Sequence, residues 1–334
     1  MLANGTLALE LALHVLGVGE GDEVIVTPRS YFASASCVIQ VGARPIFAEI
    51  DRDSQNITAQ IIDEKIITRI KAVVPVHLTG WPCDMPTIMD LAQEHGFKVI
   101  EDCAQAYGGS IDGEPVGWFG DAAASSFCQD KIMSTAGEGG MLLTNDSISW
   151  QQAWEFRDHG KSREHMFADD HPPGFRWLHE SFGSNWRLTE IQGAIGRIQL
   201  RKLDDWIKAR RANADRLRDG LSDMSVLRIP EPASHEHHAY YKFYVFVGPE
   251  RLKRGWSRDR TLTAMHEKGI PGLSGAFPEI YREKAFSGQY YEALPIAREL
   301  GETSLMFMVH PTLDRSDIDN VIAVTREVVS EATD

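Results

Sequence analysis

The sequence VIEDCAQAY, at residues 99–107, places a carboxylate, Asp102, at the end of a short apolar run. A second run, AAASSFCQ at 122–129, is followed closely by an amine, Lys131. Short continuous apolar runs are typical of strands that are buried on both faces of a parallel sheet. Ligands bind at the carboxyl ends of such strands, so we expect Asp102 and Lys131 to lie close together at one sheet edge.

The rest of the first two hundred residues alternates between strand and helix patterns. Strands are predicted at 22–28, 44–51, 71–77, 97–102 and 141–145, with helices at 6–17, 31–42, 61–67 and 85–94. This alternation predicts an α/β fold with a mainly parallel sheet covered by helices.

The C-terminal part has a different pattern. Apolar residues at helical spacing predict one long helix from Thr189 to Leu221, which we expect to lead into a second domain. A strand at 237–247 and helices at 260–268 and 316–331 follow. We therefore divide the chain into a large domain, 1–205, and a smaller C-terminal α+β domain, 206–334.

Composition excludes several classes of partner. The chain has 334 residues and a net charge of −14, with 34 Lys and Arg against 48 Asp and Glu. Sequence-independent binding to nucleic acid or to anionic membranes needs a basic surface, so we expect neither partner. No signal peptide and no apolar run long enough to span a bilayer is visible, which predicts a cytoplasmic protein.

Cysteine and histidine spacing gives no metal site. Cys37, Cys83, Cys103 and Cys128 are scattered and fit buried reduced thiols. The cluster HEHH at 235–238 lacks the HExxH spacing, and we predict no metal. The tryptophans Trp154, Trp177 and Trp186 are expected to be packing residues.

An acid and an amine at neighbouring strand ends are what a pyridoxal phosphate site requires. A lysine forms a Schiff base with the aldehyde of this cofactor, and an aspartate keeps its pyridine nitrogen protonated. We assign these roles to Lys131 and Asp102. The start of the helix after Asn4-Gly5-Thr6 offers unpaired N–H groups that suit a phosphate, although an ordinary Asn or Thr N-cap explains the same residues.

Five ordered motifs carry a family resemblance: NGT at 4–6, EDCAQAYG at 101–108, SFCQDK at 126–131, GEGG at 137–140 and GSNWRLTEIQGAIG at 183–196. In order and spacing the chain resembles the DegT-type sugar-nucleotide aminotransferases over nearly all its length. The resemblance implies the fold type I of pyridoxal phosphate enzymes, with pyridoxal 5′-phosphate as cofactor. It also implies a homodimer that shares site residues across its interface.

The resemblance implies further cofactor contacts. Gly5, Thr6 and Ser126 match residues that hold the phosphate, Gln105 matches one beside the phenolic oxygen, and Tyr31 matches an aromatic residue that stacks on the ring. A buried packing tyrosine is the alternative for Tyr31.

Two further motif positions concern the partner subunit and the substrate. Asn185 matches an asparagine that reaches the phosphate in the partner subunit, although it could instead cap the helix at Thr189. Arg187 and His77 are candidate substrate contacts.

The function implied is transfer of an amine from L-glutamate to a keto-deoxysugar nucleotide, in surface glycan or amino-sugar biosynthesis. One alternative is the dehydratase branch of the family, where a histidine replaces the lysine that is Lys131 here. Another is a non-catalytic or regulatory homologue, because NGT lies directly after Met1-Leu2-Ala3 whereas family members usually have a longer N-terminal segment.

Overall fold

The central sheet has six strands in the order β2-β1-β3-β4-β7-β8. The computed structural model describes residues 1–334 except 172, 290 and 334. Five strands are parallel: β1 (Glu23–Val26), β2 (Arg44–Phe47), β3 (Ile70–Val74), β4 (Lys98–Asp102) and β7 (Ala122–Ser126). The sixth, β8 (Gly140–Leu143), runs antiparallel to β7. The predicted α/β fold with a mainly parallel sheet is confirmed.

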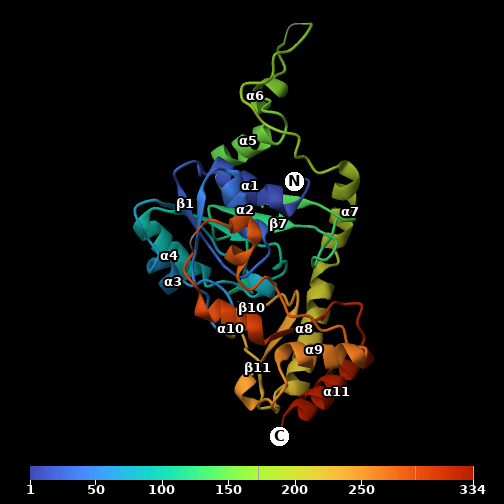
Figure 1. The fold of residues 1–334 in the computed structure, drawn as a ribbon. Helices are drawn as coiled ribbons and strands as arrows, with labels where there is room; N and C mark the ends of the chain where they lie inside the picture. The colour runs from blue at the N-terminus through green and yellow to red at the C-terminus, as the bar shows by residue number, and fades with distance from the viewer. Residues whose placement is uncertain (172, 290, 334) are drawn as a thin grey trace.

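Helices cover this sheet, as Figure 1 shows. They are α1 (Gly5–Val15), α2 (Ala33–Gln40), α3 (Ala59–Asp63), α4 (Met85–His95) and α5 (Ser147–Phe156), while the short α6 (Arg163–Met166) lies beyond α5, away from the sheet. Every residue of β1 and β7 is buried, because apolar side chains on both faces pack under helices. Helix α1 packs against β7 and β8, which brings its N-terminus to the end of β7.

The C-terminal part forms its own hydrophobic cluster around a three-stranded antiparallel sheet. Its strands are β9 (Leu227–Arg228), β11 (Phe243–Val247) and β12 (Ser304–Phe307). The helices of this cluster are α8 (Leu203–Leu221), α9 (Arg258–Glu267) and α11 (Arg315–Ala332), whereas α10 (Pro295–Thr303) buries its apolar residues in the core around the six-stranded sheet. The domain boundary at residue 205 stays a prediction.

Short elements complete the fold. A small sheet in the order β10-β5-β6 joins β5 (Ser110–Ile111) and β6 (Glu114–Pro115) to β10 (Glu236–His237). Single 3₁₀ turns are Leu78–Gly80, Pro249–Arg251, Ile280–Arg282 and Lys284–Phe286. Among the described residues, none of the helices has both the length and the apolar character needed to cross a bilayer.

The single long helix predicted from Thr189 to Leu221 is wrong. Two helices occupy this stretch, α7 (Glu190–Leu200) and α8, separated by Arg201 and Lys202. The Lys202 N–H donates to the carbonyl of Gln199, three residues back, which tightens the chain into a turn. The apolar spacing continues across this turn and gave no indication of the break.

Candidate active site

One cavity of about 430 Å³ lies at the carboxyl ends of β1, β4 and β7 and at the start of α1. The strands end there because each apolar run passes into a polar loop. In parallel sheets, ligands bind at this carboxyl edge. Seven predicted site residues line this cavity, which we call the main cavity: Gly5, Thr6, Tyr31, Asp102, Gln105, Ser126 and Lys131. The structure therefore brings together residues from four distant parts of the sequence.

The N-terminus of α1 faces the main cavity. Asn4 is the N-cap, and its Oδ1 accepts a hydrogen bond from the Leu7 N–H at 2.9 Å. Gly5 lies so close to β7 that an added Cβ would meet the Ser126 Cβ at 2.7 Å, so a larger residue would push the helix away. The N–H groups of the first turn have no partner within the helix, and they lie beside the Thr6 and Ser126 hydroxyls. This arrangement suits a phosphate.

Asp102 is a buried carboxylate on the wall of the main cavity, with 4% of its surface exposed. It accepts hydrogen bonds from the Ser34 hydroxyl at 2.8 Å and the Ala104 N–H at 3.1 Å. Burial raises its pKa, and the donors together with the nearby Lys131 ammonium offset only part of that rise. A cationic ring nitrogen in the cavity would stabilise the ionised form.

Lys131 lies on the loop after β7, with 13% of its side chain exposed. Its Nζ is 3.6 Å from Asp130 Oδ1 and 5.2 Å from the centroid of the Tyr241 ring. The Tyr241 hydroxyl donates to Asp130 Oδ2 at 2.6 Å, which fixes the ring beside the amine. Tyr241 comes from the C-terminal part of the chain, so both parts contribute to the surroundings of Lys131.

Gln105 and Tyr31 differ in their exposure to solvent. Gln105 is buried, and its Oε1 accepts a hydrogen bond from the Thr79 N–H at 2.8 Å, which fixes the amide at the cavity wall. Tyr31 is 60% exposed, with its ring 6.2 Å from the Phe277 ring in an edge contact. The alternative of a buried packing tyrosine is wrong, and the ring is available to a ligand.

His77 is not placed where a substrate contact needs it. It is fully buried and is absent from the residues that line the main cavity. Its Nδ1 accepts from the Cys83 N–H at 3.0 Å, so the proton is on Nε2, which donates to Glu101 Oε2 at 3.0 Å. The position of His77 after a strand predicted the right edge of the sheet. The predicted substrate contact is corrected, because the side chain points into the protein.

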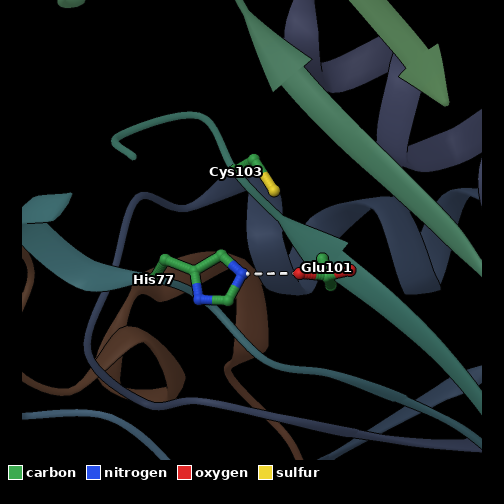
Figure 2. Close-up of side chains that lie close together, drawn as sticks. All are labelled: His77, Glu101 and Cys103. Atoms are coloured by element: carbon green, nitrogen blue, oxygen red, sulfur yellow. Dashed lines mark hydrogen bonds and ion pairs between the residues drawn. The ribbon is translucent and has the colours of Figure 1, made fainter. Parts of the chain in front are cut away.

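Figure 2 shows His77, Glu101 and Cys103, which form a possible metal-ligand group among the described residues. Glu101 also accepts the N–H groups of Gly117, Phe119 and Gly120 at 2.8, 2.8 and 2.7 Å. Both nitrogens of His77 are already used. Because the nitrogen and oxygen atoms that would bind a metal are engaged in hydrogen bonds, the group serves to anchor the 117–120 loop to β4.

Asn185 and Arg187 lie on the surface, away from the main cavity of their own chain. Arg187 donates to Asn185 Oδ1 at 3.2 Å and to Asp158 Oδ1 at 2.6 Å. The N-cap of α7 is Thr189, so the alternative in which Asn185 caps this helix is wrong. A role for either residue in a cavity would require another copy of the chain.

Sequence reasoning missed Ser34, Asp130 and Tyr241. Ser34 lies in the first turn of α2, shortly after the end of β1, and a polar side chain at that place is a usable indication. Asp130 adjoins the lysine. Nothing in the sequence pairs Tyr241 with residue 130, because their contact is purely tertiary.

Comparisons with known proteins identify relatives of the whole chain. Residues 1–326 match the model of the DegT/DnrJ/EryC1/StrS aminotransferase family. A UDP-N-acetyl-3-dehydro-alpha-D-glucosamine 3-aminotransferase of Acidithiobacillus ferrooxidans is 36% identical over 98% of this chain and 83% of that protein. A GDP-perosamine synthase of Escherichia coli O157:H7 is 32% identical over 99% of this chain and 85% of that protein.

Solved structures show the same likeness. An aminotransferase from Psychrobacter cryohalolentis superposes with a TM-score of 0.97 at 47% identity, over 99% of this chain and 87% of that one. DesV of S. venezuelae, in complex with a ketimine intermediate, gives 0.89 at 32% identity, over 100% of this chain and 85% of that one. The chain belongs to the DegT/DnrJ/EryC1/StrS aminotransferase family.

Proposed function

We propose that this protein is a pyridoxal phosphate-dependent aminotransferase that moves an amine from L-glutamate to a keto group of a nucleotide-linked deoxysugar. The observation that carries the proposal is the main cavity itself. It joins a buried carboxylate with a raised pKa, an amine, and a helix N-terminus with two hydroxyls. A cofactor with a pyridine nitrogen, an aldehyde and a phosphate matches these three features.

Different residues of the main cavity would contact different parts of the cofactor. The first turn of α1 with Thr6 and Ser126 would hold the phosphate, and Asp102 would face the ring nitrogen. Lys131 would take the aldehyde carbon. When bound, pyridoxal phosphate supplies an electron sink that allows a Cα–H bond of an amino acid to break.

Tyr31 and Gln105 supply the remaining contacts. The exposed Tyr31 ring is placed to cover one face of the cofactor, and the Gln105 amide, fixed by Thr79, lies at the cavity wall. Neither side chain has to move out of a packed core to make these contacts.

Lys131 also serves as the proton carrier. Its Nζ would accept the proton released from the substrate carbon and return it one step later, as a general base and acid. Tyr241 and Asp130 hold this amine near one position, which keeps it oriented for proton transfer.

The substrate class follows from relatives. The named relatives act on UDP-, GDP- and dTDP-linked sugars, which supports a nucleotide-linked keto sugar as acceptor. A spore coat polysaccharide biosynthesis protein of Bacillus subtilis is also 34% identical, which supports a role in surface glycan synthesis. We place the reaction in the cytoplasm, where nucleotide sugars are made.

A homodimer is part of the proposal. Residues 167–171 and 173–182 extend away from the sheet, at the end of the molecule far from the C-terminus (Figure 1). Trp177 is 87% exposed and Phe182 is 100% exposed, so the prediction that Trp177 packs within its own chain is wrong. Exposed aromatic side chains of this kind mark an interface. We propose that a second copy covers them.

The dimer would also give a role to the surface residues of the 183–196 motif. Asn185 and Arg187 follow directly on the exposed segment, and neither reaches the main cavity of its own chain. We propose that they act at the main cavity of the partner subunit.

The other two functions are less well supported. Lys131 stands where the dehydratase branch has a histidine. A non-catalytic homologue would have no need of the buried Asp102. Burial raises the pKa of this carboxyl, so its ionised form destabilises the fold when no cation is bound beside it.

The test is the visible absorption spectrum of the purified protein with added pyridoxal phosphate, before and after L-glutamate. We expect a band of lysine-bound cofactor that glutamate shifts, and its loss in Lys131→Ala. Lys71→Ala is the control, since Lys71 is exposed near the start of β3. Absence of any band in the wild type contradicts the enzyme proposal. A band that glutamate leaves unchanged contradicts glutamate as donor.

A further inference from the structure

Lys242, one residue before β11, shares an aromatic neighbour with Lys131. The Lys242 Nζ is 4.7 Å from the centroid of the Tyr241 ring, and the Lys131 Nζ is 5.2 Å from the same centroid. Asp130 holds the Tyr241 hydroxyl at 2.6 Å. One fixed ring therefore supports both ammonium groups.

Lys242 lines a second cavity of about 210 Å³, which adjoins the main cavity. The two cavities share the wall residues Ser30, Tyr31, Gln105, Asp130 and Lys131. Most other wall residues of the second cavity are apolar or aromatic. A group that extends from Lys131 into this space would meet the Lys242 ammonium as a positive charge in a largely apolar wall.

The Lys242 ammonium has no acidic partner in direct contact among the described residues, although the charge of Asp130 acts on it from the same cavity wall. Among the residues that the structure describes, no carboxylate lies within 4.0 Å of its Nζ, which donates instead to the Met308 sulfur at 2.8 Å. A thioether is a weak acceptor. Other half-buried lysines of this chain have a carboxylate, such as Lys65 with Glu292 at 3.0 Å. A partly buried, unpaired cation costs stability. The chain has a net charge of −14, so a shortage of acidic residues does not explain why Lys242 has no carboxylate in contact.

Cationic neighbours of Lys242 outnumber the anionic one, with Arg210 and Lys131 against Asp130. The guanidinium of Arg210 is also buried, and it donates to the backbone carbonyls of Tyr240 and Tyr241 at 3.2 Å rather than to an acid. Burial, followed by the charges of Arg210 and Lys131, lowers the pKa of Lys242 to about 8, and the charge of Asp130 offsets only part of this effect. Most Lys242 side chains therefore keep their charge at neutral pH, and little water has to be removed before an anion binds.

We propose that Lys242 binds an anionic oxygen group of a substrate in the second cavity. The inference rests on the proposed function. Two groups share this chemistry: a carboxylate of the amino donor and a phosphate oxygen of the sugar nucleotide. The cavity is smaller than the roughly 300–1,000 Å³ of sites that enclose drug-sized ligands, which favours the carboxylate of a small amino acid.

The test compares Lys242→Met with the wild type and with the surface control Lys208→Met, all loaded with cofactor. Calorimetry measures binding of glutarate, a diacid without an amine, and separately of UDP. The spectral half-reaction gives the apparent affinity for L-glutamate. Loss of a charged hydrogen bond predicts about 10- to 100-fold weaker binding in Lys242→Met. Lys242→Arg keeps the charge and should stay closer to the wild type.

Thermal unfolding separates binding from a structural role. Because Met replaces an unpaired charge with an apolar chain, Lys242→Met should melt no lower than the wild type. If Lys242→Met does not fold, Lys242→Arg and Lys242→Gln carry the same comparison.

Each outcome decides something. Weaker glutarate and glutamate binding supports the donor carboxylate, and weaker UDP binding alone supports the phosphate. If Lys242→Met binds glutarate, L-glutamate and UDP as tightly as a wild type that responds to glutamate, this inference alone is overturned. A wild type that does not respond to glutamate overturns the proposed function and this inference with it.

Discussion

Glu101 and Asp102 are neighbours on β4, and both are buried, yet the chain treats the two carboxylates differently. Successive side chains of a strand point to opposite faces of the sheet. Glu101 accepts from the His77 ring and from three backbone N–H groups. Among the described residues, the Asp102 carboxylate accepts only from Ser34 and Ala104.

The difference appears in the pKa values. Burial raises the pKa of Glu101, but hydrogen bonds from His77, Gly120 and Gly117 outweigh burial and leave the pKa below its usual value. Burial raises the pKa of Asp102, and its donors do not compensate. One carboxylate is therefore paired by the protein and stabilises the fold. The other lacks a full set of donors and faces a cavity, as a ligand-binding group does.

The largest expected effect is on catalysis, in Asp102→Asn. An amide cannot form an ion pair with a cationic ring nitrogen, and loss of a buried ion pair costs about 3–5 kcal/mol. We expect the glutamate half-reaction to slow by about 100- to 4,000-fold, because each 1.4 kcal/mol is tenfold. Stopped-flow absorbance measures this rate. Unfolding of the cofactor-free protein should change by less than about 1 kcal/mol, since the amide oxygen can still accept from the Ala104 N–H and the amide NH₂ can donate to the Ser34 hydroxyl.

A rate in Asp102→Asn that equals the wild-type rate contradicts the assignment of Asp102 to the ring nitrogen. A rate that falls together with a large loss of stability in the cofactor-free protein contradicts the contrast with Glu101.

Glu101→Gln should show the reverse pattern. The amide keeps one oxygen acceptor, but its NH₂ faces backbone donors, so buried N–H groups lose their partner. We expect a loss of about 3 kcal/mol in the free energy of unfolding, measured with urea, and a half-reaction rate within a few-fold of the wild type. Glu94→Gln, on the exposed surface of α4, is the control. Equal stability of Glu101→Gln and the wild type would show that the four donors stabilise nothing.

The two carboxylates should also differ in the sign of their pH dependence. The pKa of Glu101 is lower in the folded than in the unfolded chain, so its stabilisation is present above the ordinary value of 4.5 and is lost as the pH falls through the folded value. The difference in unfolding free energy between wild type and Glu101→Gln should therefore shrink below pH 4.5.

Asp102 should behave in the opposite way. Its pKa is raised in the folded protein, so in the cofactor-free protein its ionisation destabilises the fold as the pH rises from the unfolded value of 3.8 through the folded value. Asp102→Asn should gain stability relative to wild type over that window. Denaturation curves of the cofactor-free proteins at several pH values measure both trends, and parallel curves would contradict the contrast.

The sequence allowed the sheet, the main cavity and most of its residues to be predicted, for a physical reason. Buried parallel strands must be apolar throughout, so Asp102 and Ser126 stand out at the ends of such runs. The pattern does not show what packs beside those ends. The contacts of Tyr241 and Lys242 with the loop at Lys131 depend on how the C-terminal part docks.

The wrong predictions have the same origin. His77 lies at the predicted edge but points into the protein, where it meets Glu101. Trp177 was expected to be a packing residue and is exposed. In each case the pattern gives the position along an element, and only the surrounding fold gives the direction of the side chain.

The smallest expected effect is that of His77→Gln, which tests whether His77 belongs with Glu101 or with the substrate. Glutamine can still donate to Glu101 and accept from Cys83, although at altered lengths, so we expect a loss of about 1–2 kcal/mol in unfolding free energy. Because His77 does not line the main cavity, the apparent affinity for glutamate and the half-reaction rate should not change. A weaker affinity at unchanged stability would instead return His77 to the substrate, and the two faces of β4 would then both serve the reaction.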